Sequence, residues 1–257
     1  LDERGITKDN VDGVGIGIPG PVNENGEVPM AVNLHWGFKA VASELSALTG
    51  LPAKAANDAN IAALGEAWKG AAEGSKNVIL VTLGTGVGGG IIIDSKIIAG
   101  YHGAGGEIGH ACVNHNEVRP CNCGNHGCLE QYASATGVVR MAKESMEPDS
   151  VLAQKAETLT AKDVFDAAKA GDTYGCKVVD RFGRYLGIAL SNVAQVVDPE
   201  AFVIGGGVSA AGQIILDSVE KYYNEYSMFA LKNKEFHLAE LGNDAGIYGA
   251  VRMVMFQ

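Results

Sequence analysis

The sequence has 257 residues, and 35 of them are glycine, about twice the share that is usual in soluble proteins. The glycines have no three-residue period, which excludes collagen, and 47% hydrophobic with 19% charged residues excludes a disordered chain. The formal charge of −10 argues against a nucleic-acid or anionic-membrane surface and favours a small substrate. No signal peptide or membrane-spanning run is visible, so we expect a cytoplasmic protein.

Strand and helix patterns alternate along the first hundred residues. Residues 11–18 alternate β-branched with small residues and predict a strand. Apolar residues at helical spacing predict a helix that ends at Gly50, and a second helix follows the short strand-like segment 52–57. The apolar run 78–81 predicts a strand buried on both faces, and residues 91–98 predict a β-hairpin.

The second half of the chain is mainly helical. The stretch 100–127 is too long for a simple connector, so we expect it to be functional or ordered by a metal. Three helices are predicted after it: one at about 129–146, one that begins at Thr160 with a capping box at Asp163, and one at about 173–197. A buried strand at 201–204 and a C-terminal helix are predicted further on. This alternation of strands and helices predicts an α/β protein.

Two glycine-rich loops follow predicted strands. Residues 84–90 contain the pattern G-x-G-x-x-G, but a dinucleotide site needs a helix directly afterwards, and a hairpin follows here. No Gly-Lys pair occurs, which excludes a Walker loop. The loop therefore either holds a phosphate, with Thr85 as an extra donor, or is a hairpin without a ligand. Residues 205–207 end a strand and precede a helix, where glycines serve either ligand binding or close packing.

A histidine and three cysteines form the pattern H-x10-C-x-C-x4-C between His110 and Cys128. One imidazole and three thiolates are the donors of a structural zinc site that has no open position for water. Four nearby side chains are close enough in sequence to replace one of these ligands, and this alternative stays open: His102, Cys112, His115 and His126.

Asn57 and Asp58 follow a strand-like segment and precede a helix. Either residue type is a common helix N-cap, which explains the position without any function. Asp58 could equally be a general base that takes a proton from a substrate hydroxyl, with Asn57 orienting that substrate. Both interpretations can hold together.

Four motifs together carry a family resemblance: residues 57–60, 83–90, 107–110 and 121–130. In this order they resemble the ROK family of sugar kinases and repressors, and within it the glucokinases of Gram-positive bacteria. The resemblance implies an actin-like, ribonuclease H-like α/β fold of two domains with an interdomain cleft. We expect a smaller domain of residues 1–58 plus 245–257 and a larger domain of residues 59–244 that contains the zinc loop.

The resemblance also implies roles for individual residues. Asp58 matches the base that activates a sugar 6-hydroxyl for attack on the ATP γ-phosphate, with Mg²⁺ bridging phosphate oxygens. The residues that match sugar-binding positions are Asn57, Glu107, His110 and Glu130, and also Gly20 and Asn33. Those that match nucleotide-binding loops are Gly84, Thr85 and Gly86, and Gly205, Gly206 and Gly207. Those that match zinc ligands are His110, Cys121, Cys123 and Cys128.

One motif of the family is missing from this sequence. Family members begin with a strand-turn-strand segment carrying D-x-G-G-T, which helps to hold Mg²⁺ and the ATP phosphates, and no such segment precedes Val11. We therefore expect very weak kinase activity if the segment is absent. A sugar-responsive transcription regulator is the alternative function, and N-acetylmannosamine, N-acetylglucosamine, mannose and fructose are alternative substrates to glucose. A homodimer is the expected assembly.

Overall fold

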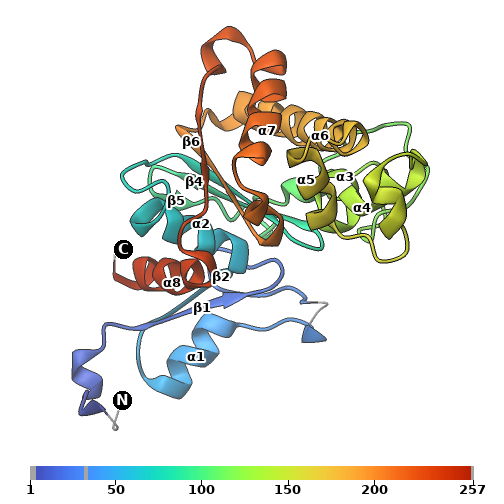
Figure 1. Ribbon diagram of the computed structural model, residues 1–257. Helices are drawn as coiled ribbons and strands as arrows, with labels where there is room; N and C mark the ends of the chain where they lie inside the picture. The colour runs from blue at the N-terminus through green and yellow to red at the C-terminus, as the bar shows by residue number, and fades with distance from the viewer. Residues whose placement is uncertain (1–3, 32–33, 256–257) are drawn as a thin grey trace. The chain divides into compact units, whose positions relative to one another are not determined.

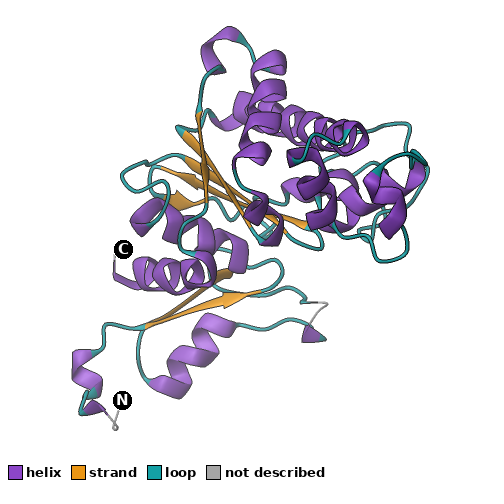
Figure 2. Cartoon of the chain, in the orientation of Figure 1, coloured by secondary structure: helices purple, strands orange, loops and turns teal. Residues whose placement is uncertain are grey.

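The computed structural model describes residues 4–31 and 34–255. Its helices are α1 (Val41–Thr49), α2 (Asp58–Lys69), α3 (Glu130–Ala133), α4 (Ala135–Glu144), α5 (Ala161–Lys169), α6 (Thr173–Val197), α7 (Gln213–Tyr226) and α8 (Ala245–Met255). Its strands are β1 (Val14–Ile18), β2 (Ala53–Asn57), β3 (Val78–Leu83), β4 (Val87–Ile93), β5 (Lys96–Ile97), β6 (Ala201–Gly205) and β7 (Glu235–Leu238). The predicted α/β class is confirmed (Figure 2).

Contacts divide the chain into two compact units. Unit 1 holds the residues up to 80, residues 90–106 and those from 240 onward, and unit 2 holds residues 81–89 and 107–239. Strands β3 and β4 contribute residues to both units. The described residues contain no helix that is long and apolar enough to cross a membrane.

Unit 1 is built on the parallel pair β1 and β2, in register from Val14 opposite Ala53 to Ile18 opposite Asn57. The connection between these strands contains α1, which ends at Gly50 as predicted, with that glycine in the left-handed conformation at φ 63°. A parallel pair needs such a crossover connection, and a glycine C-cap is the usual end of a helix. Apolar side chains from β1, from the crossover and from β2 form a core that includes Ile18, Val22 and Val28.

Helices α2 and α8 pack backbone against backbone within unit 1 (Figure 1). A Cβ atom at Gly65 would collide with the Ala245 carbonyl, and one at Gly249 would collide with the Ile61 carbonyl. Glycine is required at both positions because no other residue permits so close an approach. All of α2 belongs to unit 1. The domain boundary expected from the sequence lies instead between residues 58 and 59, directly after the first residue of α2, and it stays a prediction.

The larger sheet has the strand order β5-β4-β3-β6-β7, with β4 and β5 antiparallel and β6 and β7 parallel. The predicted hairpin is present, but β4 already begins at Val87, so the expected glycine loop 84–90 shortens to residues 84–86. The later glycines have a packing role: a Cβ at Gly90 would lie 2.6 Å from the Ala59 carbonyl oxygen and 2.7 Å from the Ala63 Cβ.

Helices α5, α6 and α7 gather together in unit 2 (Figure 1). The capping box at Thr160 and Asp163 and the long helix 173–197 are confirmed. The single helix predicted at 129–146 is wrong, because Ser134 is extended (φ −84°, ψ 167°) and separates α3 from α4. Its hydroxyl donates to the Glu130 carbonyl at 2.6 Å and accepts the Gly137 N–H at 3.0 Å, so one serine side chain bonds to the backbone of both helices.

Candidate functional site

Asn57 caps helix α2, as its position predicts. Its Oδ1 accepts the backbone N–H groups of Ala59 at 2.9 Å and Asn60 at 3.2 Å, and its Nδ2 donates to the Gly20 carbonyl at 3.0 Å. The side chain therefore joins the start of α2 to the turn after β1. A side-chain amide has two N–H donors, so one remains for a ligand.

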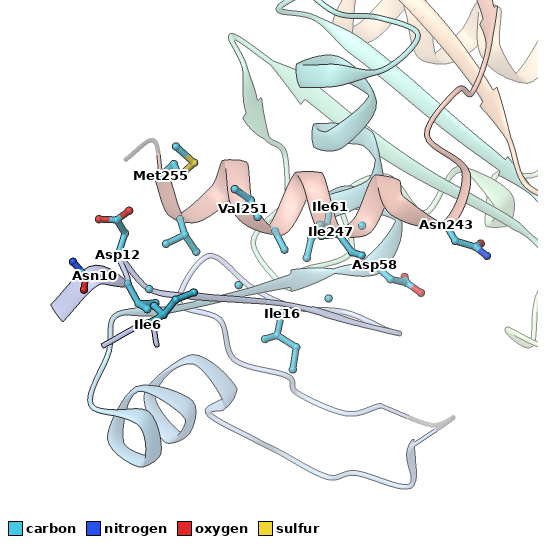
Figure 3. Close-up of a pocket in the computed structure, with 17 residues that line it drawn as sticks. Ile6, Asn10, Asp12, Ile16, Asp58, Ile61, Asn243, Ile247, Val251 and Met255 are labelled. Carbon is cyan, nitrogen blue, oxygen red and sulfur yellow. The ribbon is translucent and has the colours of Figure 1, made fainter. Parts of the chain in front are cut away.

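Asp58 is exposed at the first position of α2, where the helix dipole stabilises negative charge. Its Oδ1 accepts the Ala59 N–H at 2.9 Å. The residue lines a pocket of about 690 Å³ within unit 1. Figure 3 shows its carboxylate at one end of that pocket, with Asn10 and Asp12 at the other end. An accessible carboxylate of this kind is able to accept a proton from a bound hydroxyl.

Glu130 connects three of the predicted motifs inside unit 2. Its Oε1 lies 3.8 Å from His110 Nδ1 and accepts from the Cys121 thiol at 3.0 Å. Its Oε2 lies 2.7 Å from the point where a Cβ on Gly86 would be. Glu107 caps the 3-10 turn Ile108–His110, with its carbonyl accepting the His110 N–H at 3.1 Å and its side chain exposed.

The predicted zinc ligands His110, Cys121, Cys123 and Cys128 form a cluster whose candidate ligand atoms all lie within 4.8 Å of one another. The sulfurs of Cys123 and Cys128 are 3.6 Å apart, and that of Cys121 is 3.7 Å from His110 Nδ1. In a tetrahedral zinc site the ligand atoms are separated by about 3.6–3.8 Å, so both the donor set and the spacing fit Zn²⁺. Burial is the largest factor that raises the pKa of the Cys121 and Cys128 thiols, which a bound cation would counteract.

The alternative ligands do not join this cluster. Cys112 is exposed, and its sulfur lies 3.4 Å from His115 Nδ1. His102 belongs to unit 1, where its ring meets that of Tyr101 edge-on at 4.7 Å. His126 is exposed as well. Sequence spacing alone left these residues possible, and among the described residues the cluster does not include their side chains.

The two predicted nucleotide loops lie together in unit 2. A Cβ on Gly206, which has φ 83°, would lie 2.6 Å from both the backbone nitrogen and the carbonyl oxygen of Leu83, the residue before the first loop. By contrast, a Cβ on Gly84 or Gly207 would meet no atom within 4 Å. One glycine thus allows the strand ends to approach each other, while the other two border open space.

That open space is part of a pocket of about 540 Å³ lined by Gly84, Thr85 and Gly207 together with one face of α5. Sequence reasoning missed the residues that complete it, chiefly Lys162, Phe165, Lys169 and Ala135. The capping box at Thr160 predicted the start of α5 but could not indicate which pocket α5 lines. Two further bonds fasten the first loop: Ala135 N–H to the Gly84 carbonyl at 2.8 Å, and Thr136 Oγ1 to the Thr85 carbonyl at 2.8 Å.

Glu117 anchors the long loop that leads to the histidine–cysteine cluster, a role that the sequence did not suggest. Its carboxylate accepts the Tyr132 hydroxyl at 2.7 Å, the Arg119 N–H at 3.1 Å and Arg140 Nη1 at 3.3 Å. The backbone hydrogen bond from Arg119 is the largest factor that lowers the pKa of Glu117 to about 2.

Asn33, the remaining predicted sugar-binding residue, lies outside the described residues.

Comparison with known proteins identifies the family. A family model described as "ROK family" matches residues 3–256, and the chain therefore belongs to the ROK family. It is 46% identical over 258 residues to a glucokinase from Halalkalibacterium halodurans, across 98% of this chain and 78% of that relative. The predicted family is confirmed.

The structure is also similar to a ROK family glucokinase from Streptomyces griseus that was solved in complex with glucose and AMPPNP. The TM-score is 0.80 at 34% identity, covering 98% of this chain and 83% of that one, and the expected actin-like fold class is confirmed. A xylose repressor from Caldicellulosiruptor bescii is 31% identical over 97% of this chain, which spans 64% of the repressor's length.

Proposed function

We propose that this protein transfers the γ-phosphoryl group of ATP to the 6-hydroxyl of a hexose, and that the hexose is glucose. The observation that carries the proposal is the position of Glu130, which contacts His110 and Cys121 through one oxygen and borders Gly86 through the other. Two of the predicted sugar-binding residues, Glu130 and His110, thus lie near the first glycine loop. The names of the glucokinase relatives and the glucose and AMPPNP complex support the same substrates.

In the proposed reaction, Asp58 removes the proton of the sugar 6-hydroxyl as that oxygen attacks the γ-phosphorus in line. The bond from phosphorus to the oxygen of the departing ADP breaks, and the sugar phosphate and ADP are released. Glu107, His110, Glu130 and the free N–H of Asn57 orient the sugar by hydrogen bonds to its other hydroxyls. The loop of residues 84–86 and the pocket beside residues 205–207 hold the nucleotide. Mg²⁺, when bound with ATP, would neutralise charge on the phosphate oxygens.

We further propose that the histidine and three cysteines hold a structural Zn²⁺. Substituting Cys123→Ser should abolish stoichiometric zinc binding and lower the melting temperature, because the loop would lose its cross-link. Cys112→Ser is the matched control, since Cys112 lies outside the cluster, and atomic absorption should still detect one zinc per chain. Equal zinc content in both variants would contradict the proposal.

A homodimer and a cytoplasmic location remain predictions.

The function is tested by a coupled assay of ATP-dependent phosphorylation with glucose, mannose, fructose, N-acetylglucosamine and N-acetylmannosamine. We expect glucose to give the highest kcat/KM. Asp58→Asn should lower kcat by about a thousandfold while glucose binding, measured by calorimetry, largely survives. Asp12→Asn is the control, because Asp12 lies at the opposite end of the same pocket (Figure 3).

The alternative function is that of a sugar-responsive regulator. It is supported by the similarity to a xylose repressor over nearly the whole chain. A regulator would bind a sugar with measurable affinity and show no ATP-dependent turnover. Sugar binding without turnover, in this chain and in a version that carries the D-x-G-G-T segment at its N-terminus, would reject the kinase. Turnover that survives Asp58→Asn would reject Asp58 as the base.

A further inference from the structure

Glu66 is a buried carboxylate that the proposed chemistry does not use. It lies in the last turn of α2 and is only 1% exposed. A charged group at such depth is expensive unless hydrogen bonds replace the water that it has lost. Its partners should therefore reveal what it holds in place.

Three backbone N–H groups satisfy this carboxylate. Oε2 accepts from Ala71 at 2.9 Å and from Glu240 at 3.3 Å, and Oε1 accepts from Leu241 at 2.9 Å. Ala71 follows the end of α2, whereas Glu240 and Leu241 precede α8 and are more than 170 residues away in sequence. One side chain thus ties the end of α2 to a distant segment of backbone.

That distant segment is a point where the chain passes from unit 2 to unit 1. The passage falls between Ala239 and Glu240. On the unit 2 side, the Ala239 N–H donates to the Ile204 carbonyl of β6 at 2.9 Å. On the unit 1 side, Glu66 accepts the N–H groups of the next two residues. The crossing is therefore held on both sides, by the N–H groups of three consecutive residues.

The anchor and the proposed base belong to the same helix. Asp58 and Glu66 are eight residues apart on α2, a rise of about 12 Å along a continuous α-helix. The residue after the helix is adapted to this arrangement, because a Cβ on Gly70 would collide with Glu66 Oε2. Any displacement of the carboxylate would thus loosen the connection between the crossing and the helix that bears Asp58.

We propose that Glu66 is a positioning residue for phosphoryl transfer: it fastens this crossing of the chain to the helix that carries the base. The proposal rests on the proposed role of Asp58. Transfer is sensitive to the placement of the base, since a misplacement of about 1 Å can lower the rate about a hundredfold. Sugar affinity depends mainly on groups that Glu66 does not touch, so its loss should lower kcat more than it changes the KM for glucose.

The test compares Glu66→Gln with the wild-type protein. Glutamine has nearly the same shape, but its NH₂ group faces a backbone N–H in place of an acceptor oxygen. We expect faster hydrogen exchange at the amides of Glu240 and Leu241, a kcat lower by about tenfold and a KM for glucose within about threefold of wild type. Glu73→Gln is the matched control on an exposed residue that pairs with Lys69, and it should leave all three quantities unchanged.

Gly70→Ala provides a second variant that keeps the carboxylate and displaces it. It should reproduce both the faster exchange and the split between kcat and KM. Unchanged exchange at Glu240 and Leu241 in Glu66→Gln overturns the anchor, and faster exchange with wild-type kcat overturns the positioning role. If no hexose is phosphorylated even by the wild type, the kinase proposal fails and the positioning role fails with it, while the exchange data still decide whether Glu66 holds the crossing.

Discussion

Three buried or partly buried glutamates in this chain differ in function because they differ in hydrogen-bond partners. Among the described residues, Glu66 accepts from backbone N–H groups, Glu117 accepts from a backbone N–H, a tyrosine and an arginine, and Glu130 contacts groups of the histidine–cysteine cluster. Sequence motifs identified only Glu130. The other two have no local signature, because their partners come from distant parts of the chain or from loop backbone.

The low pKa of Glu117 predicts how the stability of the protein depends on pH. The pKa falls from an ordinary 4.5 to about 2 because the Arg119 N–H, Tyr132 and Arg140 favour the carboxylate against the opposing effect of burial. A depressed pKa in the folded state adds stability above the unfolded pKa, and this contribution disappears as pH falls from about 4.5 to about 2. Glu117→Gln should therefore lower the free energy of unfolding by about 1–3 kcal/mol at pH 7.

Urea unfolding between pH 7 and pH 3 measures this effect. The gap between wild type and Glu117→Gln should be largest at pH 7 and should narrow below about pH 4.5. Glu147→Gln serves as the control, because Glu147 forms an exposed pair with Lys177 and such pairs contribute little. A gap that stays constant across the whole pH range would contradict the assigned hydrogen bonds.

At the scale of elements, the ends of β3 and β6 depend on one glycine. Gly206 combines φ 83° with an approach that would place a Cβ 2.6 Å from the Leu83 backbone, whereas Gly207 borders open space. Gly206→Ala should lower the free energy of unfolding by about 2–4 kcal/mol, from backbone strain together with the collision. Gly207→Ala should change it by less than about 0.5 kcal/mol. Chemical denaturation of both variants measures these changes. Equal losses of unfolding free energy in the two variants would contradict the different roles of Gly206 and Gly207.

Elements with local sequence signals could be predicted, whereas features that depend on packing, such as the different surroundings of these two glycines, could not. Helices with clear apolar periodicity, such as α6, and the capped start of α5 were predictable because their signals are local. The break at Ser134 was not, because serine is tolerated inside helices and its dual hydrogen bonding depends on where α3 and α4 pack. The strand β7 also escaped prediction, since Glu235–Leu238 is short and has only one buried position, Phe236, to indicate it.

The candidate site divides in the same way. The donor types of the metal cluster and the glycine loops could be read from composition and spacing. The choice of His110 over the other histidines could not, because it depends on how a loop of more than twenty residues folds. Likewise, the sequence could not show that one face of α5 lines the pocket beside Gly84 and Gly207, because this depends on how distant elements pack.

At the scale of the whole molecule, one edge of unit 1 is open. Among the described residues β1 pairs only with β2, and beside β1 lies the pocket of about 690 Å³ that it shares with α8. Figure 3 shows Ile247 and Val251 of α8 and Ile16 of β1 around it, and Ile247 is 64% exposed. An unpaired strand edge next to exposed apolar side chains is a template for a further strand.

We therefore expect that adding the strand-turn-strand segment with D-x-G-G-T before Leu1 raises both stability and turnover. The added strand would pair with the open edge of β1 and cover the apolar side chains of α8, which should raise the melting temperature by several degrees. Turnover should rise by orders of magnitude, because the aspartate and glycines of the segment would meet the ATP phosphates. A matched version with that aspartate changed to asparagine should keep the gain in melting temperature and lose most of the gain in turnover. If the added segment changes neither quantity, the open edge of β1 is not where the D-x-G-G-T segment binds.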